Sequence, residues 1–109
     1  MTFTESLAEL KNKVVAIDID GTICTEERTF ERPLAKPLPG ALEALQMIKA
    51  NNNVIILWTG RGWEQYRVTK QWLDDHDFPY DQIIMGKPIV NVFIDDRARH
   101  FKSWFELDV

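Results

Sequence analysis

The sequence predicts an α/β fold, a doubly wound parallel sheet with helices on both faces that together form three layers. Three observations support this prediction. Short apolar runs typical of buried strands alternate with segments of helical periodicity along the 109 residues. The runs are almost continuously apolar, as expected for parallel strands that are covered on both faces. Polar clusters follow the runs, and ligand sites in such sheets lie beyond the carboxyl ends of the strands.

The first half of the chain is predicted to contain two helices, one strand and an irregular segment. Residues 4–12 place leucines on one face of a short helix, with Thr4 as a candidate N-cap. Residues 13–19 form an apolar run that predicts the first strand. Residues 22–38, called the flap below, carry prolines and charges and are predicted as a loop or small hairpin. A second helix is predicted over residues 39–50.

The second half continues the alternation of strands and helices. Residues 54–58 are an unbroken apolar strand, and residues 63–75 have the periodicity of an amphipathic helix. Residues 82–85 predict a short strand and residues 90–94 predict another. The tail carries aromatic residues at helical spacing, namely Phe101, Trp104 and Phe105. Strands that alternate with helices in this way favour a parallel sheet.

Composition indicates one domain that folds without disulfides. A chain of 109 residues is long enough for one domain and too short for two, and 45% of it is hydrophobic. The single cysteine, Cys24, has no internal partner, which favours a reducing compartment and predicts a cytoplasmic protein. The N-terminus lacks the basic and apolar pattern of a signal peptide.

The same composition limits the expected partners. No apolar run approaches the ~20 residues that span a membrane, so no membrane partner is expected. The net charge of −4, from 13 basic and 17 acidic residues, argues against nonspecific binding along nucleic acid.

The most informative segment is Asp18-Ile19-Asp20-Gly21-Thr22, which directly follows the apolar residues 14–17 at the end of the first predicted strand. Acids at the end of a buried strand are costly unless a cation offsets their charge. A divalent metal with oxygen ligands is the simplest such cation. Gly21 permits a sharp turn, and Thr22 adds a hydroxyl beside the acids. The pattern therefore predicts a functional site at this strand end.

Three further motifs follow in chain order: Thr59-Gly60-Arg61, Gly86-Lys87-Pro88 and Asp95-Asp96. Together with the Asp18 to Thr22 segment, this order resembles the haloacid dehalogenase (HAD) superfamily over about residues 13–100. Most members are magnesium-dependent phosphatases that form an aspartyl-phosphate. The resemblance implies a Rossmann-like fold, a single hydrolase domain over residues 1–109, and Mg²⁺ as the cofactor.

The resemblance also implies a role for each matched carboxylate. Asp18 would be the nucleophile that attacks phosphorus and a ligand of the magnesium. Asp20 would act as general acid and then as general base, and its backbone carbonyl would face the metal. Asp95 would complete the magnesium site together with Asp18.

The remaining matched residues would bind the phosphate or support the ligands. Thr59 would donate its hydroxyl, and Gly60 its N–H, to phosphate oxygens, while Lys87 would bring positive charge to the phosphate and to Asp18. Asp96 would ligate the metal through water or orient Lys87. Thr22 would support the acids from beside them.

Several of these positions have structural alternatives. Thr59 is also suited to cap the next helix, and Lys87 to be an exposed loop lysine. Asp96 is equally suited to be a helix N-cap. Arg61 is either a contact to phosphate or substrate, or a surface charge. Cys24 lies near the motif but has no neighbouring base, so no catalytic role is expected for it.

The spacing of the motifs leaves no room for the cap domains from which HAD enzymes gain much of their selectivity. One helix and one strand nearly fill the 28 positions from Thr59 to Lys87, and the flap is too short for a helical cap. An open site is therefore expected, with a small sugar phosphate or nucleotide as substrate. The alternative substrate is a macromolecular phosphate. The alternative to an open site is a homo-oligomer in which a neighbouring subunit closes it. Arg28 and Arg32 in the flap are candidate contacts to substrate or to another subunit, unless the flap is a solvated hairpin.

Three other protein classes fit the sequence less well. A two-component receiver domain also combines acids, a threonine and Lys-Pro, but its Lys-Pro comes last, whereas Lys87-Pro88 precedes Asp95-Asp96 here. A non-catalytic HAD-like binding module is possible only if the filled catalytic positions are unused. A sugar-nucleotide transferase would need more chain for its donor-sugar site.

Overall fold

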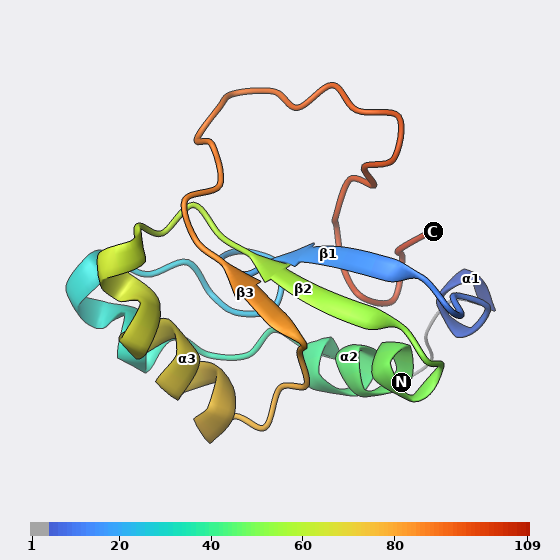
Figure 1. Cartoon of the computed structure of the whole chain (residues 1–109), viewed down its shortest axis with the longest axis horizontal. Coiled ribbons are helices and arrows are strands. Elements are labelled where there is room, and N and C mark those ends of the chain that lie inside the picture. The colour runs from blue at the N-terminus through green and yellow to red at the C-terminus, as the bar shows by residue number, and fades with distance from the viewer. Residues whose placement is uncertain (1–4) are drawn as a thin grey trace.

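A three-stranded parallel sheet forms the centre of the structure, a computed structural model that describes residues 5–109 (Figure 1). The strands are β1 (Val14–Asp18), β2 (Val54–Trp58) and β3 (Gln82–Ile84), in the order β1-β2-β3. Val14 pairs with Val54 and Asp18 with Trp58, while Trp58 pairs with Ile84 on its other side. The carboxyl ends of all three strands therefore lie at one edge of the sheet.

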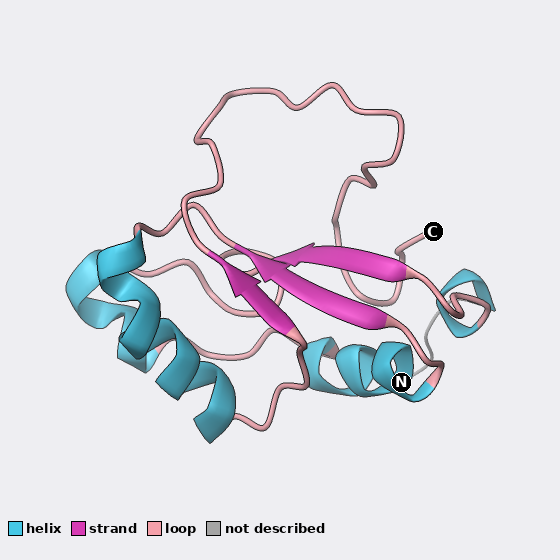
Figure 2. Ribbon diagram, in the orientation of Figure 1, coloured by secondary structure: helices cyan, strands magenta, loops and turns pink. Residues whose placement is uncertain are grey.

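The helices are short and connect the strands (Figure 2). The α-helices are α1 (Glu5–Ala8), α2 (Ala41–Ala50) and α3 (Tyr66–Asp75). There are also two 3₁₀ helices. The first, η1 (Thr29–Leu34), lies in the flap, and the second, η2 (Trp63–Gln65), lies directly before α3. These elements agree with the predicted α/β class, although each α-helix is shorter than the sequence pattern suggested. Thr4, the expected N-cap of the first helix, lies outside the described residues.

One face of the sheet carries the core. Ile55 and Leu57 of β2 are buried, and they pack in one cluster with Leu45 of α2 and Leu73 of α3. The opposite face is much more open, since Val14 is 68% exposed. Figure 1 shows α2 and α3 on the same side of the strands. The α/β class is therefore observed, whereas the third layer that the sequence predicts is not confirmed.

The predicted strand at residues 90–94 is wrong, because this segment is irregular and exposed. Val92 and Ile94 are 72% and 97% exposed. The connection explains the error. Only residues 85–89 separate β3 from this segment, whereas a parallel crossover needs about 10–12 residues to return to the amino end of the sheet. Residues 88–100, called the arch below, instead leave the carboxyl end of β3 and stand away from the sheet (Figure 1).

The tail, whose aromatic residues have helical spacing, returns to the core without forming a helix. Trp104 is 2% exposed, and its indole Nε1–H donates a hydrogen bond to the Thr22 carbonyl over 2.8 Å. The Phe105 ring lies so close to Gly40 that a Cβ atom there would clash with it. Gly40 also has a φ of +78°, a conformation that glycine adopts without strain. The helical spacing of the aromatic residues thus reflects packing of an irregular tail.

No helix within residues 5–109 has both the length and the apolar character needed to cross a membrane.

A charged bridge joins α2 to the loop before β3 and makes stability depend on pH. Lys49 Nζ lies 2.7 Å from Asp81 Oδ2, which also accepts the backbone N–H of Ile55 over 2.8 Å. The lysine and this backbone N–H lower the pKa of Asp81 below its ordinary value of 3.8. A lowered folded-state pKa contributes stability above the ordinary value, and this contribution is lost as pH falls through the lowered value.

We expect Asp81→Asn to lower the urea midpoint at pH 7 and to reduce the loss of stability between about pH 4 and pH 2. Urea unfolding at both ends of this range checks the expectation. Asp75→Asn on α3 is the matched control for the change in charge. An unchanged pH dependence in Asp81→Asn would show that this carboxylate does not contribute.

Candidate functional site

The candidate site lies at the carboxyl edge of the sheet, where two loops are joined by backbone hydrogen bonds. The Thr59 N–H donates to the Ile84 carbonyl over 3.0 Å, and the Lys87 N–H donates to the Thr59 carbonyl over 2.8 Å. The Gly86 N–H donates to the Arg61 carbonyl over 2.8 Å. These bonds continue the pairing of β2 and β3 beyond the strands. They hold the Thr59-Gly60-Arg61 and Gly86-Lys87 motifs side by side.

Asp18, the last residue of β1, lies beside Lys87. Lys87 Nζ is 3.5 Å from Asp18 Oδ1, and the Thr22 hydroxyl is 3.5 Å from Asp18 Oδ2. The Asp18 side chain remains 33% exposed. Burial raises the pKa of Asp18 above its ordinary value, and the charge of Asp20 adds to this effect, whereas Lys87 opposes it. The site thus contains a partly exposed carboxylate next to an ammonium group.

Lys87 is placed by aromatic side chains as well as by its backbone. Its Nζ lies 5.1 Å from the centre of the Trp58 ring and 4.9 Å from that of Phe93. Both distances lie within the range of a cation–π interaction. The two rings also contact each other, with centroids 6.3 Å apart. Lys87 is therefore held near Asp18 in this structure and is not a free loop lysine.

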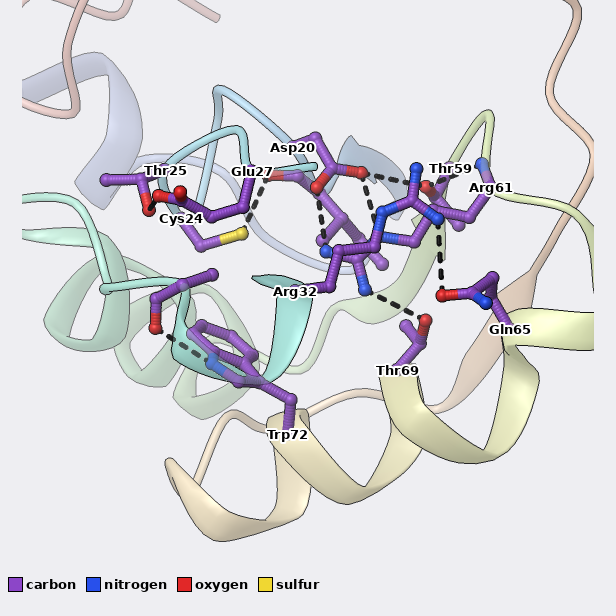
Figure 3. A network of polar contacts seen from close by, with 12 residues as sticks. Asp20, Cys24, Thr25, Glu27, Arg32, Thr59, Arg61, Gln65, Thr69 and Trp72 are labelled. Atoms are coloured by element: carbon purple, nitrogen blue, oxygen red, sulfur yellow. Dashed lines mark hydrogen bonds and ion pairs between the residues drawn. The ribbon is translucent and has the colours of Figure 1, made fainter. Parts of the chain in front are cut away.

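Asp20 forms a two-bond ion pair with Arg61 (Figure 3). Arg61 Nε–H donates to Asp20 Oδ2 over 3.0 Å, and Nη2–H donates to Oδ1 over 2.7 Å. Arg61 is only 4% exposed. A guanidinium that is buried and bonded in this way is not a surface charge, and its donors toward Asp20 are not available to a substrate.

Two threonines complete this network. The Arg61 Nη1–H donates to the hydroxyl of Thr69 on α3 over 3.0 Å. The Thr59 hydroxyl accepts the Arg61 backbone N–H over 3.1 Å and donates to Asp20 Oδ2 over 3.3 Å. Because its single proton is directed to Asp20, Thr59 can donate to a phosphate oxygen only by giving up this contact. Thr69 was not predicted as a site residue. The available signal was a polar residue on the apolar face of the helix predicted over residues 63–75.

The flap contributes Arg32 to the same region. Arg32 Nη1–H donates to the Gln65 side-chain oxygen over 3.3 Å, and the two side chains appear beside the Asp20 network in Figure 3. Arg28, the other flap arginine that the sequence analysis named, is exposed. The sequence analysis did not predict that Arg32 would meet Gln65, because their proximity depends on the path of η1 over α3.

The described residues do not assemble a complete magnesium site. Asp95 and Asp96 lie on the exposed arch, and Asp95 Oδ1 accepts the Arg97 backbone N–H over 2.8 Å. Within residues 5–109, no group of three or more acidic, histidine or cysteine side chains could hold a metal ion. Asp18 offers carboxylate oxygens of the kind that magnesium prefers, whereas the Asp20 carboxylate is bonded to Arg61. The structure therefore brings together Asp18, Asp20, Thr59, Arg61 and Lys87, but not Asp95.

Cys24 is buried next to the network and is not a reactive thiol. Its Sγ lies 3.8 Å from the Ile19 carbonyl, and burial, with the nearby Asp20 charge, raises the pKa of Cys24 to about 12. Reaction requires the thiolate, which is scarce at neutral pH under these conditions.

We expect the native protein not to react with a disulfide reagent such as dithionitrobenzoate at pH 8, and to react with one equivalent in 6 M guanidinium. The absorbance of the released thiolate measures both states. Rapid labelling of the native protein would contradict the buried position of Cys24.

No family model and no curated protein matches the sequence. Solved structures do match the fold. A crystal structure of a target protein from Vibrio cholerae aligns with a TM-score of 0.68 and 28% identity, over 79% of this chain and 81% of that chain. A structure of the Pnkp1/Rnl/Hen1 complex aligns with a TM-score of 0.62 and 22% identity, over 81% of this chain and 32% of that chain. The second likeness shows the fold alone, and the two together support a Rossmann-like α/β fold.

Proposed function

We propose that this protein is a phosphomonoester hydrolase of the HAD type that acts through an aspartyl-phosphate on Asp18. One observation carries the proposal: the partly exposed Asp18 carboxylate lies 3.5 Å from the Lys87 ammonium at the carboxyl edge of a parallel sheet. This edge is where ligands bind in such folds. The order of the four sequence motifs supports the same conclusion.

The chemistry would proceed in two steps. An Asp18 oxygen attacks phosphorus, and the bond from phosphorus to the leaving oxygen breaks while Asp20 gives a proton to that oxygen. Asp20 then takes a proton from a water molecule, whose oxygen attacks the phosphorus and releases inorganic phosphate and free Asp18. Lys87 would stabilise negative charge on the phosphoryl oxygens and favour the approach of an anionic substrate to Asp18.

We propose Mg²⁺ as the cofactor, although the described residues do not form its full ligand set. Asp18 and Asp95 would hold it, and Asp95 would have to leave its position on the exposed arch. A magnesium ion would offset the charge that accumulates when a carboxylate meets a phosphate. A phosphorylated small molecule, either a sugar phosphate or a nucleotide, is the proposed substrate. A macromolecular phosphate is the alternative that an open site allows.

A non-catalytic binding module is the second candidate function. The exposed position of Asp95 favours it, since a phosphate-binding site with Lys87 but without a bound metal would bind and not hydrolyse. Turnover separates the two candidates directly.

We expect magnesium-dependent hydrolysis of p-nitrophenyl phosphate, lost with EDTA and restored by added Mg²⁺. Asp18→Asn should lower kcat by at least about a thousandfold, because it removes the nucleophile. Steady-state assays, followed by a panel of sugar phosphates, nucleotides and phosphopeptides, provide the measurement.

Asp108→Asn in the exposed tail is the control for loss of one carboxylate, and it should keep wild-type activity. If turnover survives both Asp18→Asn and EDTA, the mechanism is wrong. If no substrate turns over but phosphorylated ligands bind, the binding module is the correct alternative.

A further inference from the structure

The Arg61 side chain is a buried cation, and two of its three nitrogens donate to one carboxylate. It leaves the loop after β2 and is 4% exposed. Two of its nitrogens, Nε and Nη2, donate to the two different oxygens of Asp20, and the third, Nη1, donates to Thr69 of α3. A buried guanidinium is costly unless it is paired and hydrogen-bonded, and these three contacts meet that requirement.

The geometry restricts Asp20 more than a single charge contact would. Two parallel N–H···O bonds from a planar guanidinium fix both the position and the plane of a carboxylate. The Thr59 hydroxyl is a third donor to the Asp20 carboxylate and lies 3.3 Å from Oδ2. By contrast, the contacts of the Asp18 carboxylate to the Lys87 ammonium and the Thr22 hydroxyl are both longer, at 3.5 Å. Of the two acids, Asp20 is therefore the one held in a fixed orientation.

Thr69 in turn fixes the guanidinium. It is 1% exposed on the inner face of α3, and its hydroxyl is the contact that ties Arg61 to this helix. The chain from Thr69 through Arg61 to Asp20 thus relates the orientation of the carboxylate to the position of α3 (Figure 3).

We infer that Arg61 is a positioning residue for Asp20: it holds the ionised carboxylate in the orientation in which Asp20 accepts a proton from the attacking water. This inference rests on the proposed function and assigns Arg61 no contact with substrate. The guanidinium gives up no proton. During breakdown of the aspartyl-phosphate, the proton moves from water to Asp20, the water oxygen bonds to phosphorus, and the bond from phosphorus to Asp18 breaks.

The inference predicts which step suffers when Arg61 is changed. p-Nitrophenolate leaves without needing a proton, so the first step should proceed in Arg61→Lys, whose ammonium cannot make two parallel bonds. The second step should slow by about a hundredfold, since misplaced catalytic groups cost rates of this order. Rapid mixing with p-nitrophenyl phosphate should then show a burst of about one nitrophenolate per protein, followed by slow turnover.

Three comparisons make the test specific. Asp20→Asn should give the same burst, and the double variant should be no slower than Asp20→Asn alone. Arg67 is an exposed arginine on α3, and Arg67→Lys should leave both phases at wild-type rates. Thr69→Val, which keeps the ion pair but removes the contact with α3, should slow the second phase to a smaller extent. Equal slowing of both phases in Arg61→Lys, or loss of amplitude without a change in either rate, would overturn the inference.

A measurement that needs no activity separates this inference from the proposed function. The Arg61 Nε–H should give an NMR signal that is protected from exchange with water in the wild type and loses its protection in Asp20→Asn. Exchange as fast as that of Arg67 would overturn the inference even if the enzyme hydrolyses phosphate. Protection in a protein without turnover would leave Arg61 fixing Asp20 and would remove the proposed reaction instead.

Discussion

The ion pair between Asp20 and Arg61 is the interaction on which the arrangement of the site depends. It joins the turn after β1 to the loop after β2, and Thr69 extends it to α3. Removing the Asp20 charge would leave the buried guanidinium without its anionic partner, which lowers stability. The three elements must therefore meet at this point for the chain to fold as observed. Stability and site geometry depend on the same contacts.

The pair also separates two acids that look equivalent in the sequence. Asp18 is partly exposed and faces the ammonium of Lys87, which lies between the Trp58 and Phe93 rings. Asp20 faces a rigid guanidinium and the Thr59 hydroxyl. One carboxylate is thus accessible and the other is held in place. A nucleophile needs access, and a group that moves protons needs a defined direction, so the two environments suit the two proposed roles.

The arch after Lys87 is the least ordinary part of the fold. Its apolar residues are exposed, and it carries the acids that would complete a metal site. The short connection from β3 prevents it from joining the sheet as a further parallel strand. Phe93 of the arch contacts Lys87 and Trp58 of the site. The proposed cofactor therefore depends on the one segment whose position departs from the sequence prediction.

The sequence by itself determined the α/β class, the three strands within a residue of their observed bounds, and the sheet edge where the candidate site lies. These features follow from local periodicity and from polar residues placed directly after apolar runs, and both are visible within a few residues of chain. The acids at Asp18 and Asp20 were found for the same reason.

Only the tertiary structure decided what each side chain contacts. Three contacts join residues far apart in the chain. They are the ion pair of Arg61 with Asp20, the hydrogen bond of Arg32 to Gln65, and the hydrogen bond of the Trp104 indole to the Thr22 carbonyl. No local pattern encodes such contacts. The exposed position of residues 90–94 was decided by the length of a connection and not by strand propensity, because a β-branched apolar run forms a strand only where the chain can bring it to an open edge.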